Sequence, residues 1–135
     1  MLVREIMNNN IYSIDSTESV REALRVMYSL GIQRLFIFDK KENPIGIISY
    51  KDILLLLGSD ETMIDVDTVK IYDIMTENVN TIDAGATISD AANLMLRADI
   101  SGLLVTENSE NVGVITKTDI CRIVAISDVT PQITI

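Results

Sequence analysis

The sequence GIISYKDI at residues 46–53 returns as GVITKTDI at residues 113–120. Each copy has a glycine, a hydroxyl residue three positions later and an aspartate three positions after that. The match also covers the sequence before these stretches: residues 3–38 align without a gap on residues 71–106, with Met7 on Met75. A register sustained over this length indicates that the chain is two copies of one small unit.

The small size of the repeat predicts that each copy needs the other for a stable fold. The chain has 135 residues, and a unit of roughly 60 residues buries too little surface to be comfortably stable alone. We therefore expect residues 1–58 and 71–126 to form two units that pack together. Residues 59–70 would be an acidic linker, and residues 127–135 a tail that frays or adds an edge strand to a partner.

Within each copy, the residue pattern predicts the order strand, helix, strand, strand, helix. A short apolar strand is expected at residues 11–14 and 79–82, and a buried hairpin follows the first helix. Ser19 and Thr87, each followed three residues later by an acid, are N-cap patterns for that first helix. The predicted fold class is thus α/β (α+β), with two tandem βαββα units. The last helix of the first copy, at residues 53–57, is apolar on all sides and should be covered on more than one face.

Composition argues against several kinds of chemistry. The chain has no histidine and a single cysteine, Cys121. Zinc or haem sites, and nucleophiles activated by an imidazole, are therefore not expected. We interpret Cys121, in an apolar helical stretch, as a core residue. We expect no metal, no obligatory cofactor and no enzymatic activity.

The net charge of −9 disfavours nucleic acid and anionic membranes as partners, since Lys and Arg dominate binding to both. The start of the chain lacks the apolar core of a signal peptide. The longest apolar run, residues 53–57, is far shorter than the roughly 20 residues that span a bilayer. We expect a cytoplasmic protein without membrane contact.

Ser49-x-x-Asp52 and Thr116-x-x-Asp119 each stand where a strand is followed by a helix. A helix start offers unpaired N–H groups and partial positive charge, which suit a phosphate, and a carboxylate one turn on can accept hydrogen bonds from ribose hydroxyls. The same spacing also describes an ordinary N-cap with an acid at its third position. A ribonucleotide cradle and a purely structural cap both remain open at this point.

Apart from the linker and the tail, the chain resembles a cystathionine β-synthase (CBS) domain pair, a stand-alone Bateman-type module. The resemblance is carried by REIM at residues 4–7, YDIMT at residues 72–76, the capped first helices and the two Gly-x-x-Ser/Thr-x-x-Asp endings. It implies two units related by a pseudo-twofold axis, with two clefts that bind AMP, ADP, ATP, S-adenosylmethionine or similar ligands. It also implies a homodimer that regulates a partner protein.

In such modules, each cleft combines the Ser/Thr-x-x-Asp of one unit with the strand starts of the other. Carried over here, the first cleft would hold Val114, Thr116, Asp119, Met7, Tyr12, Ile32, Gln33 and Arg34, with Lys117 nearby. The second cleft would hold Ile47, Ser49, Asp52, Thr76, Asn80, Ile100, Ser101 and Gly102.

The two clefts differ in their charge. Arg34 stands where some family members place a basic residue on a phosphate, whereas the matching position in the other copy is Gly102. The cleft of Asp119 is therefore the expected phosphate site, since charge-assisted contacts are strong. Arg34 as an exposed charge beside a strand is the alternative. The cleft of Asp52 would take a less charged ligand such as S-adenosylmethionine, or stay empty.

Three functional classes follow from these features. The first is a regulatory sensor in which an adenosyl ligand shifts the balance between two states. The alternative is an oligomerisation or interaction scaffold with vestigial ligand sites, whose apolar helices mediate association. An enzyme using Asp52 or Asp119 as general base finds no nucleophile, metal site or second base in the sequence.

Overall fold

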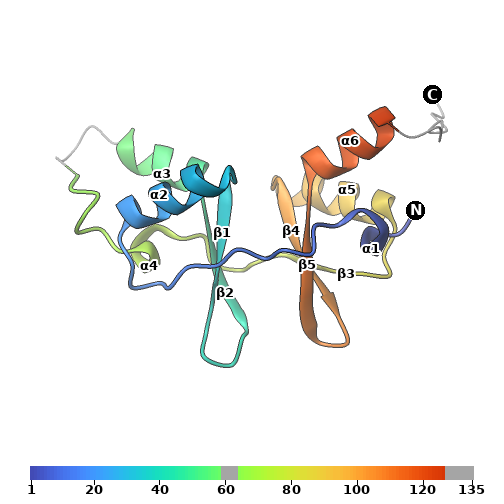
Figure 1. Cartoon of the computed structure of the whole chain (residues 1–135), viewed down its shortest axis with the longest axis horizontal. Helices are drawn as coiled ribbons and strands as arrows, with labels where there is room; N and C mark the ends of the chain where they lie inside the picture. The colour runs from blue at the N-terminus through green and yellow to red at the C-terminus, as the bar shows by residue number, and fades with distance from the viewer. Residues whose placement is uncertain (59–63, 127–135) are drawn as a thin grey trace. The chain divides into compact units, whose positions relative to one another are not determined.

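The computed structural model describes residues 1–58 and 64–126 (Figure 1). The expected tail at residues 127–135 and part of the expected linker lie outside the described residues. The chain divides into two compact units, one of Tyr12–Val79 and one of Met1–Ile11 together with the chain from Asn80 onward. Each unit is built from helices and a small sheet, so the predicted fold class is confirmed.

In the unit of residues 12–79, the described residues form one hairpin and three helices. Its elements in chain order are α2 (Val20–Leu30), β1 (Arg34–Phe38), β2 (Pro44–Ser49), α3 (Tyr50–Leu57) and α4 (Ile71–Ile74). β1 and β2 are antiparallel. The strand expected at residues 11–14 is reduced to one bridge, Ser13 with Phe36. The ladder stops there because the Asp15 carboxylate accepts the N–H of Thr17 and turns the chain.

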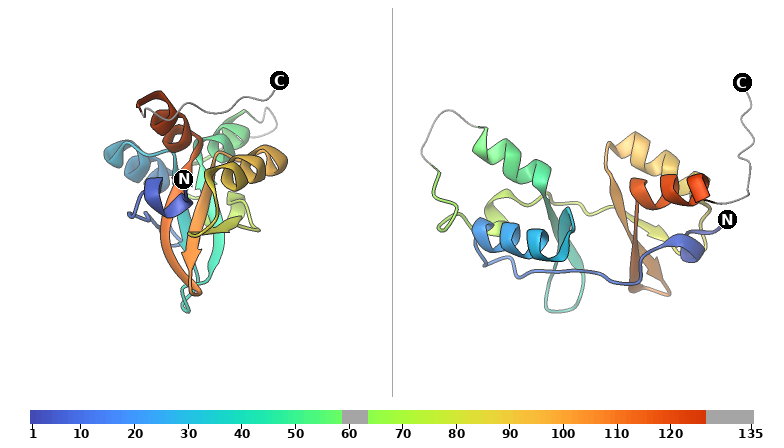
Figure 2. Two further views of the ribbon diagram at one scale, coloured as in Figure 1. Left: turned by 90° about the vertical axis from the view of Figure 1, so that its right-hand side faces the viewer. Right: turned by 45° about the horizontal axis from the view of Figure 1, so that its top comes forward.

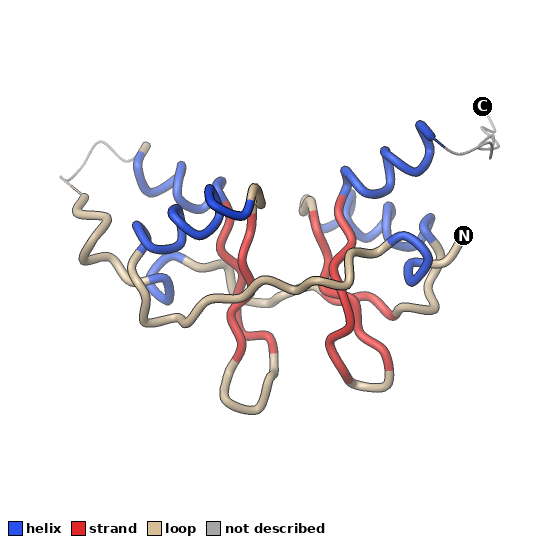
Figure 3. Tube along the Cα trace, viewed as in Figure 1, coloured by secondary structure: helices blue, strands red, loops and turns tan. Residues whose placement is uncertain are grey.

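The second unit contains a three-stranded sheet. Its elements are α1 (Val3–Ile6), β3 (Thr81–Asp83), α5 (Ile88–Ala98), β4 (Gly102–Glu107), β5 (Glu110–Thr116) and α6 (Lys117–Ile126). The strand order is β3-β4-β5, with β3 parallel to β4 and β4 antiparallel to β5. Figure 3 shows a helix directly after the second strand of each hairpin: α3 starts where β2 ends, and α6 starts where β5 ends.

The predicted caps position α2 in one unit and α5 in the other. The hydroxyl of Ser19 accepts from the N–H of Glu22 at 3.2 Å. The hydroxyl of Thr87 accepts from the N–H of Asp90 at 3.1 Å, and the Asp90 carboxylate accepts the N–H of Thr87 in return. α2 ends at Gly31, whose φ of 67° is the left-handed conformation that glycine adopts easily. These caps fix where the apolar face of each helix begins.

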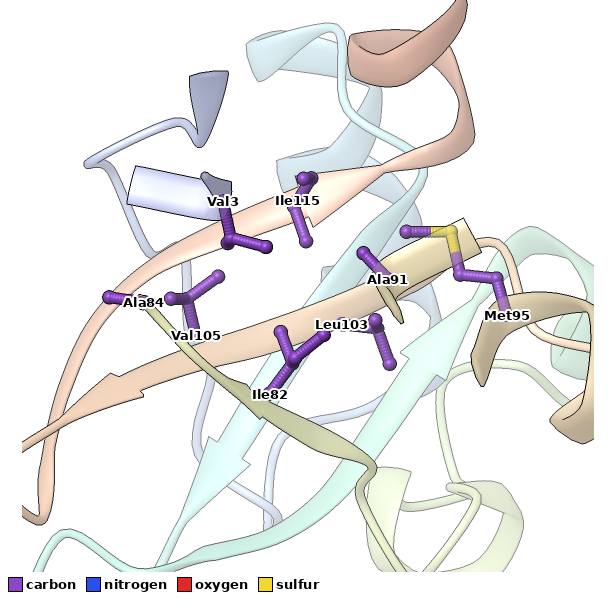
Figure 4. Packing of buried hydrophobic residues seen from close by; sticks show 8 residues of the cluster. All are labelled: Val3, Ile82, Ala84, Ala91, Met95, Leu103, Val105 and Ile115. Atoms are coloured by element: carbon purple, nitrogen blue, oxygen red, sulfur yellow. The ribbon is translucent and has the colours of Figure 1, made fainter. Parts of the chain in front are cut away.

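Each unit has its own apolar core. The core of the unit 12–79 consists of Val20, Ala23, Met27, Leu35, Ile37, Ile48, Ile53 and Ile71. The core of the other unit consists of Val3, Ile82, Ala84, Ala91, Met95, Leu103, Val105 and Ile115 (Figure 4). In both, the apolar stripe of a capped helix lies against hairpin strands, as the sequence pattern predicts. Figure 2 gives two further views of these helices and strands.

The segment that opens each sequence copy packs in the unit of the other copy. The N–H of Val3 donates to the carbonyl of Ala86 at 2.8 Å, and Arg4 forms an ion pair with Glu107 at 2.8 Å. In the same way, the N–H of Ile71 donates to the carbonyl of Glu18 at 2.9 Å. The compact units therefore combine an opening helix from one copy with the strands and longer helices of the other.

The structure corrects one prediction and extends another. Cys121 is exposed on α6, not buried in the core, because the preceding residue, Ile120, is the one that packs against the core. On α3, Ile53 is buried, but Leu54 and Leu55 are 67% and 68% exposed. The additional cover expected for this helix is not supplied by the described residues of the chain.

No helix in the described ranges is both long enough and apolar enough to cross a membrane.

Candidate functional site

Two matching groups of polar residues stand at the junctions between β2 and α3 and between β5 and α6. We call Ile47, Ser49, Asp52 and Thr76 the Asp52 half-site, and we call Met7, Val114, Thr116 and Asp119 the Asp119 half-site. All members of the first lie in the unit 12–79, and all members of the second lie in the other unit. Each half-site can therefore be described on its own.

In the Asp52 half-site, both oxygens of the carboxylate accept hydrogen bonds. Asp52 Oδ2 accepts from the N–H of Ser49 at 2.8 Å and from the Ser49 hydroxyl at 3.0 Å. Asp52 Oδ1 accepts from the Thr76 hydroxyl at 2.8 Å. The N–H of Asp52 donates to Ser49 Oγ at 3.4 Å, which completes a reciprocal cap at the start of α3.

Thr76 is brought to Asp52 by a backbone pairing with β2. The N–H of Thr76 donates to the carbonyl of Ile47 at 2.8 Å, and the N–H of Ile47 donates back at 2.9 Å. This close approach explains the glycine of the motif, since a Cβ on Gly46 would collide with Met75 Sδ. Glycine at position 46 leaves room for the Met75 side chain where the segment carrying Thr76 lies against the strand.

The Asp119 half-site has the same reciprocal cap, but Oδ1, the carboxylate oxygen outside the cap, has a different partner. Asp119 Oδ2 accepts from the N–H of Thr116 at 2.9 Å, and Thr116 Oγ1 accepts from the N–H of Asp119 at 3.1 Å. The nearest cation to Asp119 Oδ1 is Arg122 Nη1, at 3.9 Å. The Asp119 side chain is 19% exposed, so it can be reached by a ligand.

The strand of this half-site is paired in the same way as its counterpart. The N–H of Asn8 donates to the carbonyl of Val114 at 2.8 Å, and the N–H of Val114 donates back at 2.9 Å. A Cβ on Gly113 would lie 2.7 Å from the carbonyl oxygen of Asn8 and 2.8 Å from Met7 Sδ. Both motif glycines thus serve the close approach of an opening segment.

The structural interpretation of Ser/Thr-x-x-Asp as an N-cap is confirmed by these hydrogen bonds. The cap does not use the second carboxylate oxygen in either unit. Asp52 Oδ1 accepts from the Thr76 hydroxyl, whereas Asp119 Oδ1 has only a long ion pair with Arg122. An acceptor at a helix start, beside a hydroxyl, remains suited to ribose hydroxyls, and the helix start remains suited to an anion.

Two of the remaining predicted site residues, Arg34 and Gly102, are paired with the motifs in the strand ladders. Arg34 pairs in register with Ser49, and Gly102 pairs with Thr116. The carbonyl of Ser101 accepts the N–H of Lys117 at 3.0 Å. By unit membership, Tyr12, Ile32, Gln33 and Arg34 belong to residues 12–79, and Asn80, Ile100, Ser101 and Gly102 belong to the other unit. Each predicted cleft therefore draws on both units, and its full residue set stays a prediction.

The sequence interpretation missed Asn8 and Met75 as parts of the half-sites. It assigned Met7 to one cleft and Thr76 to the other, although the repeat aligns Met7 with Met75 and Asn8 with Thr76. Strict use of that alignment would have identified both missing residues. Among the residues that the structure describes, no cluster of three or more acidic, histidine or cysteine side chains is placed to hold a metal ion.

Comparison with known proteins gives a family match over both copies. The model of the family described as "CBS domain" matches residues 3–59 and 71–126. An uncharacterized protein of Methanocaldococcus jannaschii is 28% identical over 91% of this chain, which spans 32% of that protein. Inosine-5′-monophosphate dehydrogenase of Nitrosopumilus maritimus is 31% identical over 85% of this chain, which spans 22% of the enzyme. The chain thus covers a third or less of the length of these two relatives.

Among solved structures, the CBS domain pair of protein MJ0100 superposes with a TM-score of 0.80. It is 28% identical, and the alignment covers 93% of this chain and 96% of that pair. That structure was determined in complex with 5′-methylthioadenosine and S-adenosyl-L-methionine.

Proposed function

Because this chain belongs to the CBS domain family, we propose that it is a regulatory module that binds an adenine nucleotide or adenosyl compound and modulates a partner protein. The candidates are AMP, ADP, ATP and S-adenosylmethionine. The observation that carries this proposal is the repeated cap with an outward carboxylate oxygen, present at the helix start in both units. The adenosyl ligands of the MJ0100 domain pair support the same ligand class.

The roles of the residues follow from their chemistry. Asp119 would accept from ribose hydroxyls, Asp52 would do so only as far as its hydrogen bond with Thr76 allows, and the starts of α6 and α3 would attract a phosphate or carboxylate group. Arg34 and Lys117 would add charge-assisted contacts to a phosphate in the cleft of Asp119. Met7, Val114, Ile47 and Ile32 would supply apolar contacts to the base, as is usual in small-molecule sites.

A scaffold is the second candidate function, and one observation favours it. α3 exposes Leu54, Leu55 and Leu57, at 67%, 68% and 52%. Several exposed leucines on one short helix are unusual unless another surface covers them. We propose a homodimer formed through this helix, which is compatible with ligand binding and does not replace it.

Thermal melting with ligands tests the proposed function. A ligand at 100 times its dissociation constant stabilises the folded state by about 2.7 kcal/mol, which raises Tm by roughly several degrees for a domain of this size. We expect such a rise with at least one of AMP, ADP, ATP, S-adenosylmethionine and 5′-methylthioadenosine. The double variant Asp52→Ala, Asp119→Ala is the matched control and should show a smaller rise. Unchanged Tm with every ligand, and no heat in calorimetry, would contradict ligand sensing.

A further inference from the structure

The two half-sites differ at the oxygen that faces away from the cap. We infer that Thr76 is a specificity-determining residue, whose hydroxyl occupies Asp52 Oδ1 and thereby makes the Asp52 half-site poor at recognising ribose hydroxyls. This inference rests on the proposed function, since it concerns which adenosyl ligand groups each half-site accepts. It does not depend on Arg34 or on the phosphate.

The hydrogen bonds of Asp52 leave little acceptor capacity for a ligand. Three donors from the protein already reach its carboxylate, two on Oδ2 and the Thr76 hydroxyl on Oδ1. An incoming ribose must share Oδ1 with Thr76 or displace it. Because a hydrogen bond to a charged group is among the stronger ones, displacing it removes much of what the new bond contributes.

The carboxylate of Asp119 is open by comparison. Within residues 1–58 and 64–126, no hydrogen bond to Asp119 Oδ1 is formed, and its ion pair with Arg122 is long, at 3.9 Å. The Arg122 side chain is 64% exposed, so this contact is screened by solvent and easily exchanged. A ribose hydroxyl can therefore bind Asp119 Oδ1 without breaking a hydrogen bond of the protein.

The cause of the difference is a single residue at equivalent backbone positions. Thr76 and Asn8 form the same pair of backbone hydrogen bonds, with Ile47 and Val114 respectively. Thr76 directs a hydroxyl to the aspartate, whereas the side-chain carbonyl of Asn8 accepts from the N–H of Asn10 at 2.9 Å. Both side chains are exposed, so each can be exchanged without disturbing a core.

The test compares adenosine with 2′,3′-dideoxyadenosine, which lacks both ribose hydroxyls, by isothermal titration calorimetry on the full chain. In an Asp119→Ala background only the Asp52 half-site can use a carboxylate. We expect the two nucleosides to bind there within about threefold of each other. Adding Thr76→Val, which keeps the shape and removes the hydroxyl, should make adenosine bind about tenfold or more tightly than the dideoxy compound. Thr76→Ser, which restores the hydroxyl, should return the ratio to its first value.

The reciprocal exchange uses Asn8→Thr in an Asp52→Ala background. The Asp119 half-site should prefer adenosine by about tenfold or more before the exchange, and by about threefold or less after it. If the Asp119→Ala protein already shows the tenfold preference, or if Thr76→Val leaves the ratio unchanged, the inference is overturned while the proposed function stands. If no variant binds adenosine, AMP or S-adenosylmethionine, the proposed function fails and the inference fails with it.

Discussion

At the scale of single residues, the two motif glycines have the same role but different tolerance. A Cβ on Gly113 would meet a backbone carbonyl oxygen, that of Asn8, at 2.7 Å, in addition to Met7 Sδ. For a Cβ on Gly46, the three nearest atoms all belong to the side chain of Met75. A methionine side chain can move to another rotamer, whereas a paired backbone segment has to shift as a whole.

We therefore expect Gly113→Ala to lower the free energy of unfolding by about 2–3 kcal/mol, and Gly46→Ala by about 1 kcal/mol or less. Urea unfolding measures both values. Shortening the obstructing side chain, as in Gly46→Ala with Met75→Ala, provides the control, because it should remove the steric part of the Gly46 effect. Equal losses for the two single variants would contradict the difference in tolerance.

Asp39 gives a pH dependence that belongs to one residue. Its carboxylate accepts the N–H of Asn43 and of Lys41, both at 2.9 Å, at the turn between β1 and β2. The Asn43 backbone hydrogen bond, followed by the Asn43 side chain and Lys41, lowers the pKa of Asp39 below its ordinary 3.8. A lowered pKa in the folded state means stability that is present above the unfolded value and is lost as pH falls through the folded value.

NMR titration of the Asp39 carboxyl carbon should therefore give a midpoint below 3.8 in the folded protein. The same titration in concentrated urea should return the midpoint to the ordinary value, since the turn is then absent. The hydrogen bonds of this turn should weaken over the same acidic range. A folded midpoint at or above the unfolded one would contradict the proposed turn geometry.

At the scale of elements, the helices and hairpins were predictable because their signals are local. Ser19 and Thr87 indicate the starts of α2 and α5, and the apolar runs predict β1 and β4. α1 and α4 were not predicted, because four residues form about one turn and show no periodicity. Cys121 was wrongly assigned to the core because an apolar composition in α6 does not reveal which face lies inward.

The part of the candidate site that local sequence motifs encode was predictable as well. The aspartates, their capping hydroxyls and their helix starts follow from the spacing of the repeated motif. The contact between Thr76 and Asp52 joins residues 24 positions apart, and it depends on a backbone pairing that no local pattern encodes. For that reason the inequality of the half-sites at their carboxylates emerged only from the structure.

The exposed leucines of α3 lead to a prediction about association. Leu55→Glu should convert a dimer into a monomer, since a charge at the centre of an apolar contact leaves an unpaired buried group. Multi-angle light scattering at micromolar concentration measures the change. Leu96→Glu is the matched control, because Leu96 is 74% exposed on α5, a different helix. A monomeric wild-type protein, or equal dissociation by both variants, would contradict association through α3.

At the scale of the whole molecule, the compact units and the sequence copies do not share boundaries. A fragment of residues 12–79 contains the complete core that includes Val20, Leu35 and Ile71. A fragment of residues 1–58 lacks Ile71 and carries Val3, whose core partners are in the second copy. The repeat in the sequence thus indicates the duplication but not the units that pack.

We expect the fragment 12–79 to be the more stable of the two, with a cooperative transition in urea, although a unit of this size is marginal by itself. Circular dichroism during urea unfolding compares them at equal concentration. Ile71→Ala in the longer fragment should reduce its stability by about 2–5 kcal/mol, as for other buried isoleucines. A fragment 1–58 that matches or exceeds 12–79 in stability would contradict the boundaries drawn from the structure.

The exchange of opening helices also bears on the duplication itself. A chain with one copy alone would have the strands and longer helices of a unit, but its opening helix would have to fold back or be supplied by a second molecule. When two copies are joined in one chain, each opening helix packs within the same molecule, so its packing no longer depends on protein concentration. Each copy therefore supplies a segment that stabilises the other, and a destabilising substitution at Val3 should lower the stability of the core formed by the second copy.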